Sequence, residues 1–248
     1  MLDKAEGIVL RTISYGESNV IVTLFTREAG KLAVMAKGAK KPKSRLASIT
    51  QPFMYGMFLY YKGSGMSTLS QGDPVNSFKL LRADINKTAY ASYFVEMVDK
   101  LTEEKERNPY LFELLLQLLQ YLNEEMDEEV LMRIFETKMT AVAGIKPELD
   151  HCASCQNKEG EFSFSVKEAG FLCRQCAHID EKIIPISQQT VRLLRLFFYM
   201  DIARLGTVSL KQETKDQLKT VLETYYDEYS GLHLKSKRFL SQLEKWKL

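Results

Sequence analysis

Four cysteines are the residues whose spacing points most directly to chemistry. Cys152 and Cys155 form one C-x2-C pair, and Cys173 and Cys176 form a second pair after seventeen intervening residues. Each such turn directs two sulfur atoms toward one point, and two pairs at this separation are typical of a zinc site. Four thiolates complete a tetrahedron around Zn²⁺ and leave no position for water. The sequence therefore predicts a structural zinc ion rather than a catalytic one.

Other interpretations of the cysteines stay open at this point. The thiols could be unliganded or redox-active, and His151 or His178, which flank the two pairs, could replace one thiolate. A deaminase site is excluded because no H-x-E motif precedes a P-C-x2-C motif. The intervening segment EFSFSVKEAGFL is expected to form a hairpin that brings the two pairs together.

A basic run in the first third of the chain is the second feature with chemical meaning. The segment AKGAKKPKSRLASITQPF, residues 36–53, contains no acidic residue. Its five cations are Lys37, Lys40, Lys41, Lys43 and Arg45. Such a run is either a solvated loop or an anion-binding surface. Single-stranded nucleic-acid binding combines two components: cations that contact phosphates and aromatic rings on which bases stack. The predicted strands near this run supply aromatic residues.

The charge of the chain is strongly segregated, although the net charge is only +2. Residues 1–83 hold twelve Lys and Arg against five Asp and Glu, a net charge of +7. Residues 84–150 have a net charge of −8, and residues 151–248 have a net charge of +3. A nearly neutral whole chain is thus compatible with a polyanionic partner of its first third.

Motifs of several enzyme and membrane-protein classes are missing from the sequence. It has no phosphate-binding G-x4-G-K-[ST] loop, no G-x-G-x2-G, no H-E-x2-H and no G-x-S-x-G. The sequence has only three histidines, so few residues are available for a Ser/His or Cys/His catalytic arrangement. No signal peptide and no apolar stretch long enough for a membrane span is recognisable. We therefore expect a cytoplasmic binding protein without enzymatic activity.

The elements that must position these residues change in character along the chain. Five short segments of residues 1–80 are rich in β-branched and apolar residues and are separated by turn-like sequences. They are residues 6–13, 19–26, 31–37, 52–61 and 66–69. Five short strands with many aromatic residues predict a small β-barrel that is closed or partly open. The basic run would connect strands three and four, where such barrels often hold their ligand.

Helical sequence follows the predicted barrel and returns at the end of the chain. Residue types that begin helices occur at four places: Asn108 before Pro109, Asp127, Ser187, and Ser209 three residues before Gln212. A terminal helix is expected within residues 232–248. The predicted fold class is a multidomain α+β protein. It comprises a five-stranded barrel domain (1–80), a helical domain (81–147 and 185–248) and an inserted four-cysteine zinc module (148–184).

Taken together, these features resemble the RecO family of bacterial recombination mediators. The resemblance rests on YGESNVIVTLFTREAGKLAVMAKGAKKPKSRL at residues 15–46, QPF at 51–53 and GMSTLSQGD at 65–73. It continues through the helical block, the two cysteine pairs and LKSKRFL at residues 234–240. It covers essentially the entire chain, although some members of the family lack the cysteines.

The resemblance implies a function in DNA repair and recombination and a nucleoid-associated protein. It also implies that the barrel is an oligonucleotide-binding (OB-fold) β-barrel and that residues 1–80 form an OB-fold DNA-binding domain. It implies binding to single- and double-stranded DNA, annealing of complementary strands, and partnership with RecR. It further implies contact with the acidic tail of single-strand-binding protein (SSB), so that RecA can replace SSB on DNA. Matching positions make the five cations of the basic run the candidate phosphate contacts, with Arg27 and Lys31 as secondary candidates. Arg192 and Arg195, on a helix that carries Phe197 and Phe198, are candidates for the SSB-tail contact.

Two other functions remain compatible with the residues themselves. One is an RNA-binding barrel with a zinc knuckle that acts in translation or RNA handling. The other is a zinc-dependent nucleic-acid enzyme, which the filled four-thiolate site disfavours.

Overall fold

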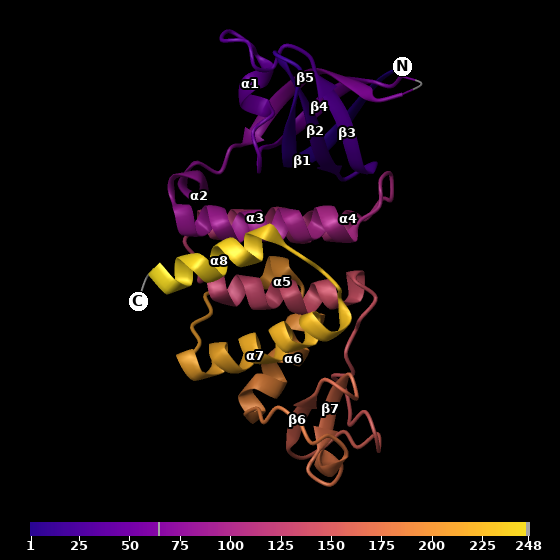
Figure 1. Ribbon diagram of the computed structural model, residues 1–248, viewed down its shortest axis with the longest axis vertical. Helices are drawn as coiled ribbons and strands as arrows, with labels where there is room; N and C mark the ends of the chain where they lie inside the picture. The colour runs from indigo at the N-terminus through magenta and orange to yellow at the C-terminus, as the bar shows by residue number, and fades with distance from the viewer. Residues whose placement is uncertain (64, 247–248) are drawn as a thin grey trace. The chain divides into compact units, whose positions relative to one another are not determined.

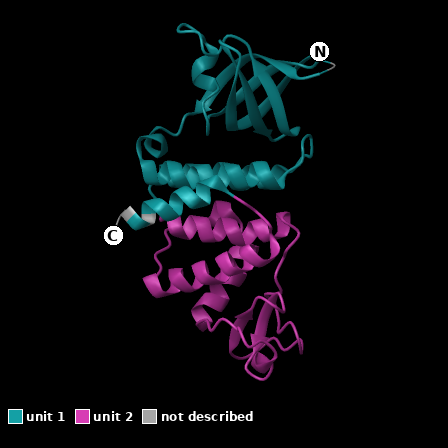
Figure 2. Cartoon of the chain, viewed as in Figure 1, with its two compact units in different colours: residues 1–125, 234–248 teal, residues 126–233 magenta. Residues whose placement is uncertain are grey.

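The computed structural model describes residues 1–63 and 65–246 (Figure 1). The chain divides into two compact units, shown in different colours in Figure 2. Unit 1 comprises residues 1–125 and 234–248, and unit 2 comprises residues 126–233. Two segments that the sequence places in one helical domain, the helices before and after residue 125, thus lie in different units. Among the described helices, none is long and apolar enough to cross a membrane.

A closed five-stranded barrel forms the N-terminal part of unit 1, as predicted (Figure 1). Its strands are β1 (Leu2–Tyr15), β2 (Asn19–Thr26), β3 (Gly30–Ala36), β4 (Tyr55–Tyr61) and β5 (Ser67–Asn76). They follow the order β1-β2-β3-β5-β4, and β1 closes the barrel by pairing with β4. Every pairing is antiparallel except β3 with β5. The barrel fold class inferred from the sequence is confirmed.

β1 is longer than predicted because it pairs with two neighbouring strands along different parts of its length. Its first half pairs with β4, its second half pairs with β2, and Gly7 is in register with both Gly56 and Thr26. β5 is also longer than predicted, because its second half is polar and follows β4 through backbone pairing alone. Apolar alternation marks only the parts of a strand that face a core.

Alternating side chains of the strands fill the barrel. On β4, Phe58 and Tyr60 point inward and are almost completely buried, whereas Tyr61 is exposed. This buried cluster also includes Ala36, Ala39 and Ile49, which belong to the basic run itself. Its members are Ala5, Val9, Val22, Leu24, Val34, Ala36, Ala39, Ile49, Met54, Phe58, Tyr60 and Leu69.

Helices α2 (Lys79–Ala83), α3 (Ile85–Leu101), α4 (Pro109–Asn123) and α8 (Lys235–Trp246) complete unit 1. The predicted start at Asn108 is confirmed, since its side chain accepts a hydrogen bond from the Leu111 backbone N–H. The C-terminal α8 packs against α3. The side chain of Glu96 in α3 fixes the first turn of α8, because it accepts hydrogen bonds from the backbone N–H groups of Lys235 (3.1 Å) and Ser236 (2.8 Å).

Unit 2 consists of three helices and a small two-stranded hairpin. The helices are α5 (Glu128–Val142), α6 (Gln188–Tyr199) and α7 (Gln212–Tyr229), and the strands are β6 (Phe162–Ser165) and β7 (Gly170–Cys173). Asp127 and Ser187 cap α5 and α6 as predicted. The predicted capping box at Ser209 is wrong, because α7 begins two residues later than that box requires and Lys211 takes the N-cap position without a side-chain hydrogen bond.

Candidate nucleic-acid interface and metal centre

The basic loop, defined as residues 37–45, lies between β3 and α1 (Leu46–Ile49) on the barrel surface. All five of its cationic side chains are exposed. Among the ion pairs of the described residues, none involves any of the five. The loop therefore presents uncompensated positive charge to solvent, as a phosphate-binding segment requires.

The backbone of the basic loop is nevertheless anchored at its start. The side-chain oxygen of Asn19 accepts a hydrogen bond from the Gly38 N–H (2.8 Å), and the Ser18 carbonyl accepts one from the Lys40 N–H (2.9 Å). Between them, Ala39 is buried in the barrel cluster. This anchoring places the cations at defined positions on the barrel, whereas a free loop would lose entropy on binding.

The short helix α1 anchors the other end of the loop. Its buried Ile49 packs against two glycines of the barrel wall, Gly56 and Gly72. A Cβ atom at position 72 would lie 2.4 Å from Ile49 Cγ1, so only glycine allows α1 to approach this closely.

We expect Gly72→Ala to displace α1 and destabilise unit 1 by about 1–3 kcal/mol, since the added methyl group overlaps a buried side chain. Chemical denaturation of the purified variant measures this change. Gly65→Ala is the matched control, because a Cβ atom there would meet no heavy atom within 4 Å. Equal stabilities of the two variants would contradict the close approach.

Arg27 and Lys31, the secondary candidates, are engaged within unit 1. The Arg27 guanidinium contacts Glu6 (2.7 Å) and Glu113 (2.9 Å) and lies 4.6 Å from the centre of the Phe112 ring. The Lys31 ammonium donates to the Asp99 backbone carbonyl (2.5 Å) and contacts its carboxylate (3.4 Å). Both cations thus join the barrel to helices α3 and α4, and they offer less free charge than the basic loop.

The ion pair of Arg27 predicts a pH-dependent stability. Its hydrogen bond to Glu6 lowers the pKa of that carboxyl group below the ordinary value of 4.5, against burial, which raises it. Burial, together with a hydrogen bond to Glu6, raises the pKa of Tyr55 to about 12, so Tyr55 stays neutral. A carboxyl group with a lowered folded-state pKa stabilises the fold above the unfolded-state pKa and loses this effect as pH falls.

Arg27→Met is therefore expected to lower stability by about 1–2 kcal/mol near neutral pH. The difference from the unsubstituted protein should shrink as pH falls from 4.5 through the lowered folded-state pKa of Glu6. Urea unfolding across this pH range measures the effect. A difference that persists in acid would show that Arg27 acts through packing on Phe112 alone.

The four cysteine sulfurs come together in unit 2, as the sequence predicts. They lie within 4.8 Å of one another, and those of Cys155 and Cys173 are 3.6 Å apart. Zn–S bonds of about 2.3 Å in a tetrahedron place sulfurs roughly 3.8 Å apart. The Cys173 backbone N–H also points at the Cys152 sulfur (3.4 Å). Donor type, number and spacing all fit a zinc ion.

The hairpin β6–β7 brings the two cysteine pairs together. Phe162 of β6 is in register with Cys173 at the end of β7, and the Phe171 carbonyl accepts a hydrogen bond from Ala153 N–H (2.7 Å) in the first cysteine turn. His151 and His178 do not join the sulfur group. The ring of His151 faces Glu148 (3.5 Å), and His178 contacts the Gln175 carbonyl (2.8 Å). The geometry favours four thiolates over a mixed ligand set.

The two arginines considered for the SSB-tail contact have different environments on α6. Arg195 donates to the carbonyls of Leu149 (2.5 Å) and Asp150 (3.3 Å) and lies over the Phe162 and Phe171 rings, so it fastens the zinc module to α6. Arg192 is exposed, and no ion pair in the described part of the chain involves it. The apolar side chains exposed on this helix are Leu196 and Tyr199, whereas Phe197 is buried.

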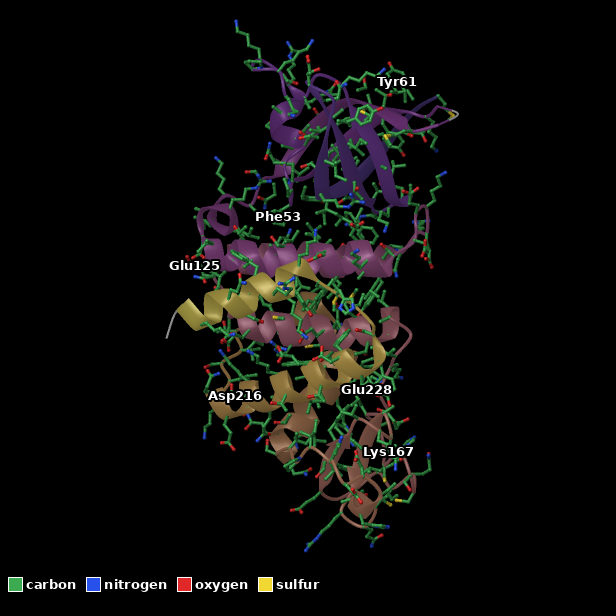
Figure 3. The ribbon with its side chains drawn as sticks, in the orientation of Figure 1. Phe53, Tyr61, Glu125, Lys167, Asp216 and Glu228 are labelled. Atoms are coloured by element: carbon green, nitrogen blue, oxygen red, sulfur yellow. The ribbon has the colours of Figure 1, made fainter. Side chains whose placement is uncertain are left out.

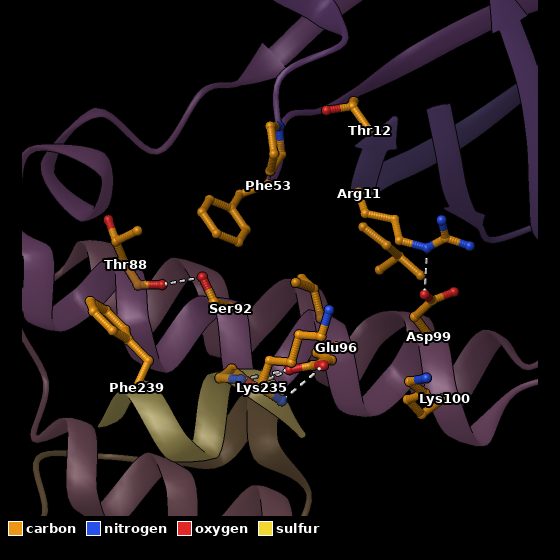
Figure 4. Close-up of a pocket in the computed structure, with 14 residues that line it drawn as sticks. Arg11, Thr12, Phe53, Thr88, Ser92, Glu96, Asp99, Lys100, Lys235 and Phe239 are labelled. Atoms are coloured by element: carbon orange, nitrogen blue, oxygen red, sulfur yellow. Dashed lines mark hydrogen bonds and ion pairs between the residues drawn. The ribbon is translucent and has the colours of Figure 1, made fainter. Parts of the chain in front are cut away.

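Sequence reasoning missed a large hollow in unit 1. It has a volume of about 810 Å³ and lies between the barrel and the helices α3 and α8 (Figure 4). Arg11 and Phe53 line it from the barrel, and Asp99 and Phe239 line it from the two helices. Its residues come from segments more than two hundred positions apart, so no local motif could have revealed it.

Comparison with known proteins identifies relatives along the whole chain. Residues 1–78 match the family model described as "Recombination protein O N terminal", and residues 82–238 match "Recombination protein O C terminal". Curated relatives from Halalkalibacterium halodurans and Bacillus subtilis are 58% and 57% identical over 98% and 100% of this chain and 96% and 97% of their own. A Bacillus cereus relative is 53% identical over the full length of both chains. All three are named "DNA repair protein RecO".

Proposed function

Because this chain belongs to the RecO family of DNA repair proteins, we propose that it acts as a non-enzymatic recombination mediator. It binds single- and double-stranded DNA through the basic loop and anneals complementary single strands. The observation that supports this proposal is the anchored loop, on which Lys37, Lys40, Lys41, Lys43 and Arg45 are exposed without ion pairs among the described residues.

The mechanism of annealing needs electrostatics and no turnover chemistry. Two DNA strands repel each other through their phosphates, and a cationic surface that contacts both lowers this repulsion and raises their local concentration. If about 4–6 phosphates are engaged, the logarithm of the affinity should fall with the logarithm of salt concentration with a slope of roughly −3 to −4 on single strands. Binding should be nearly independent of base sequence, because phosphates carry no sequence information.

The proposed partners are RecR and the acidic C-terminal tail of SSB. Contact with the tail would recruit the protein to SSB-coated DNA, and the complex with RecR would then help RecA to replace SSB. Arg192 beside the exposed Leu196 and Tyr199 supports a tail contact on α6, since a cation next to apolar side chains suits an acidic segment with an apolar end. The partnership with RecR rests on family membership alone.

The proposed zinc ion is structural. Cys152, Cys155, Cys173 and Cys176 would hold it and leave no coordination position for substrate or water. Metal binding to four thiolates would stabilise a module whose hairpin strands have only four residues each.

Annealing of complementary strands coated with SSB tests the proposed function. Full-length SSB and SSB without its tail are compared at the same coating density, with strand annealing followed by fluorescence quenching. Acceleration by this protein on full-length SSB, and much less on tail-deleted SSB, is the expected result. No acceleration on either substrate would exclude the mediator function.

A further inference from the structure

The hollow between the barrel and helices α3 and α8, of about 810 Å³, has no part in the proposed function. We propose that it receives bases of the single strand whose phosphates lie along the basic loop. This inference rests on the proposed DNA binding and extends it, because it gives the strand a path and a second kind of contact. The supporting observations are the continuity of the surface, its aromatic lining and its charge.

The hollow is continuous with the basic loop. A smaller depression of about 430 Å³ beside the loop is lined by Lys40 and Lys41. Thr12 of β1 lines both the depression and the larger hollow. Gln51 lines the depression, and its neighbour Pro52 lines the hollow. The depression and the hollow therefore adjoin at Thr12, so a strand held at the lysines lies next to the hollow.

Two aromatic rings line the hollow from opposite elements. Figure 4 shows Phe53 directed from the barrel toward α3, and Phe239 on α8 beside Thr88. Phe53 is nearly buried and forms part of the wall of the hollow, whereas Phe239 is 39% exposed and available for stacking. Base stacking on such rings tolerates any sequence, because every base has a π-face.

The backbone conformation of Phe53 supports a functional role for this residue. Its φ angle is +66°, a left-handed conformation that is strained for a bulky residue. Backbone hydrogen bonds hold it there, from Phe53 N–H to the Val9 carbonyl (2.8 Å) and from Val9 N–H to the Met54 carbonyl (2.9 Å). Strain of this kind persists where the surrounding structure enforces it, and it concentrates at functional sites.

The charges around the hollow also suit a polyanion. Asp99 is neutralised by Arg11 (2.6 Å) and Lys31 (3.4 Å). The Glu96 carboxylate accepts hydrogen bonds from the first turn of α8, including one from the Ser236 hydroxyl (2.5 Å). Lys100 and Lys235 also line the hollow, and neither forms an ion pair with a carboxylate among the described residues. Free cations thus face the entering strand while the acidic groups are already bound.

A comparison of two DNA ligands tests the proposal in the full-length protein. An oligo-dT strand is compared with a strand of equal length that carries abasic sites in place of bases. Fluorescence anisotropy measures both affinities for the unsubstituted protein, Phe239→Leu and Phe239→Tyr. Leucine keeps an apolar side chain on α8 but removes the ring, and tyrosine keeps the ring. Tyr61→Leu is the matched control, because Tyr61 is an exposed ring of unit 1 that lies on the barrel, does not line the hollow and is distant from Phe53 (Figure 3).

We expect Phe239→Leu to weaken oligo-dT binding about tenfold and to leave abasic-strand binding and the salt slope unchanged. Phe239→Tyr and Tyr61→Leu should bind both strands normally. Equal loss on both strands, or no loss on either, would overturn the base-binding role while leaving phosphate binding intact. An acidic peptide with an apolar end that loses affinity in Phe239→Leu, without a loss for oligo-dT, would overturn it in favour of a peptide site. Absence of any DNA binding by the unsubstituted protein would refute the proposed function itself.

Discussion

Replacing Lys40, Lys41 and Lys43 together by alanine is expected to weaken single-stranded DNA binding roughly a hundredfold at about 0.1 M salt. Each phosphate contact contributes about 0.7 to the salt slope on single strands, so three lost contacts flatten the slope by about 2. A slope change of this size corresponds to a hundredfold affinity change for each tenfold dilution of salt. The loss should be similar for all base sequences, because the lysines contact phosphates.

Titrations of labelled oligonucleotides at several salt concentrations measure both the affinity and the slope. A matched control replaces Lys158, Lys182 and Lys211, three exposed lysines of unit 2, and should change the slope little. An unchanged slope in the basic-loop variant would remove the loop from the DNA interface. Equal slope changes in both variants would show that binding follows net charge and not the loop.

Replacing Cys152 and Cys173 by serine is expected to abolish zinc binding and to destabilise unit 2 by about 4 kcal/mol or more. Loss of a metal belongs to the few mechanisms that cause changes of this size. The two residues come from different cysteine pairs, so neither pair remains complete. The salt slope of DNA binding should stay the same, because the basic loop belongs to unit 1.

Elemental analysis of protein purified without chelators measures the zinc content. Thermal unfolding of the unsubstituted protein with and without chelator measures how much the metal stabilises the fold, and this measurement does not require a soluble variant. His151→Ala and His178→Ala together form the control and should retain one zinc ion per chain. Protein without zinc, or a chelator that leaves the unfolding transition unmoved, would contradict a structural zinc site.

Local chemistry explains the elements that sequence analysis predicted well. Asn108, Asp127 and Ser187 begin helices as expected, because a capping side chain bonds to the backbone within three residues of itself. The clustering of the four cysteines was predictable for the same reason, since each pair and the hairpin between them are short-range structures. The barrel followed from five short segments that are rich in β-branched and apolar residues and are separated by turn-like sequences.

Long-range contacts explain what sequence analysis could not provide. Arg27 and Lys31 pair with carboxylates of helices more than sixty residues away, and nothing near them in sequence reveals those partners. The fourth strand was predicted from residue 52 but begins at Tyr55, because Phe53 adopts a left-handed conformation enforced by Val9 of β1. The hollow likewise depends on α8 returning from the end of the chain to pack on α3.

In the proposed function, the anchored basic loop brings DNA strands together. The rate at which complementary single strands anneal tests it most directly, when the unsubstituted protein and the variant without Lys40, Lys41 and Lys43 are compared at equal concentration and salt. We predict strong acceleration by the unsubstituted protein and a rate close to that of DNA alone with the variant. Equal acceleration by both proteins would contradict the account.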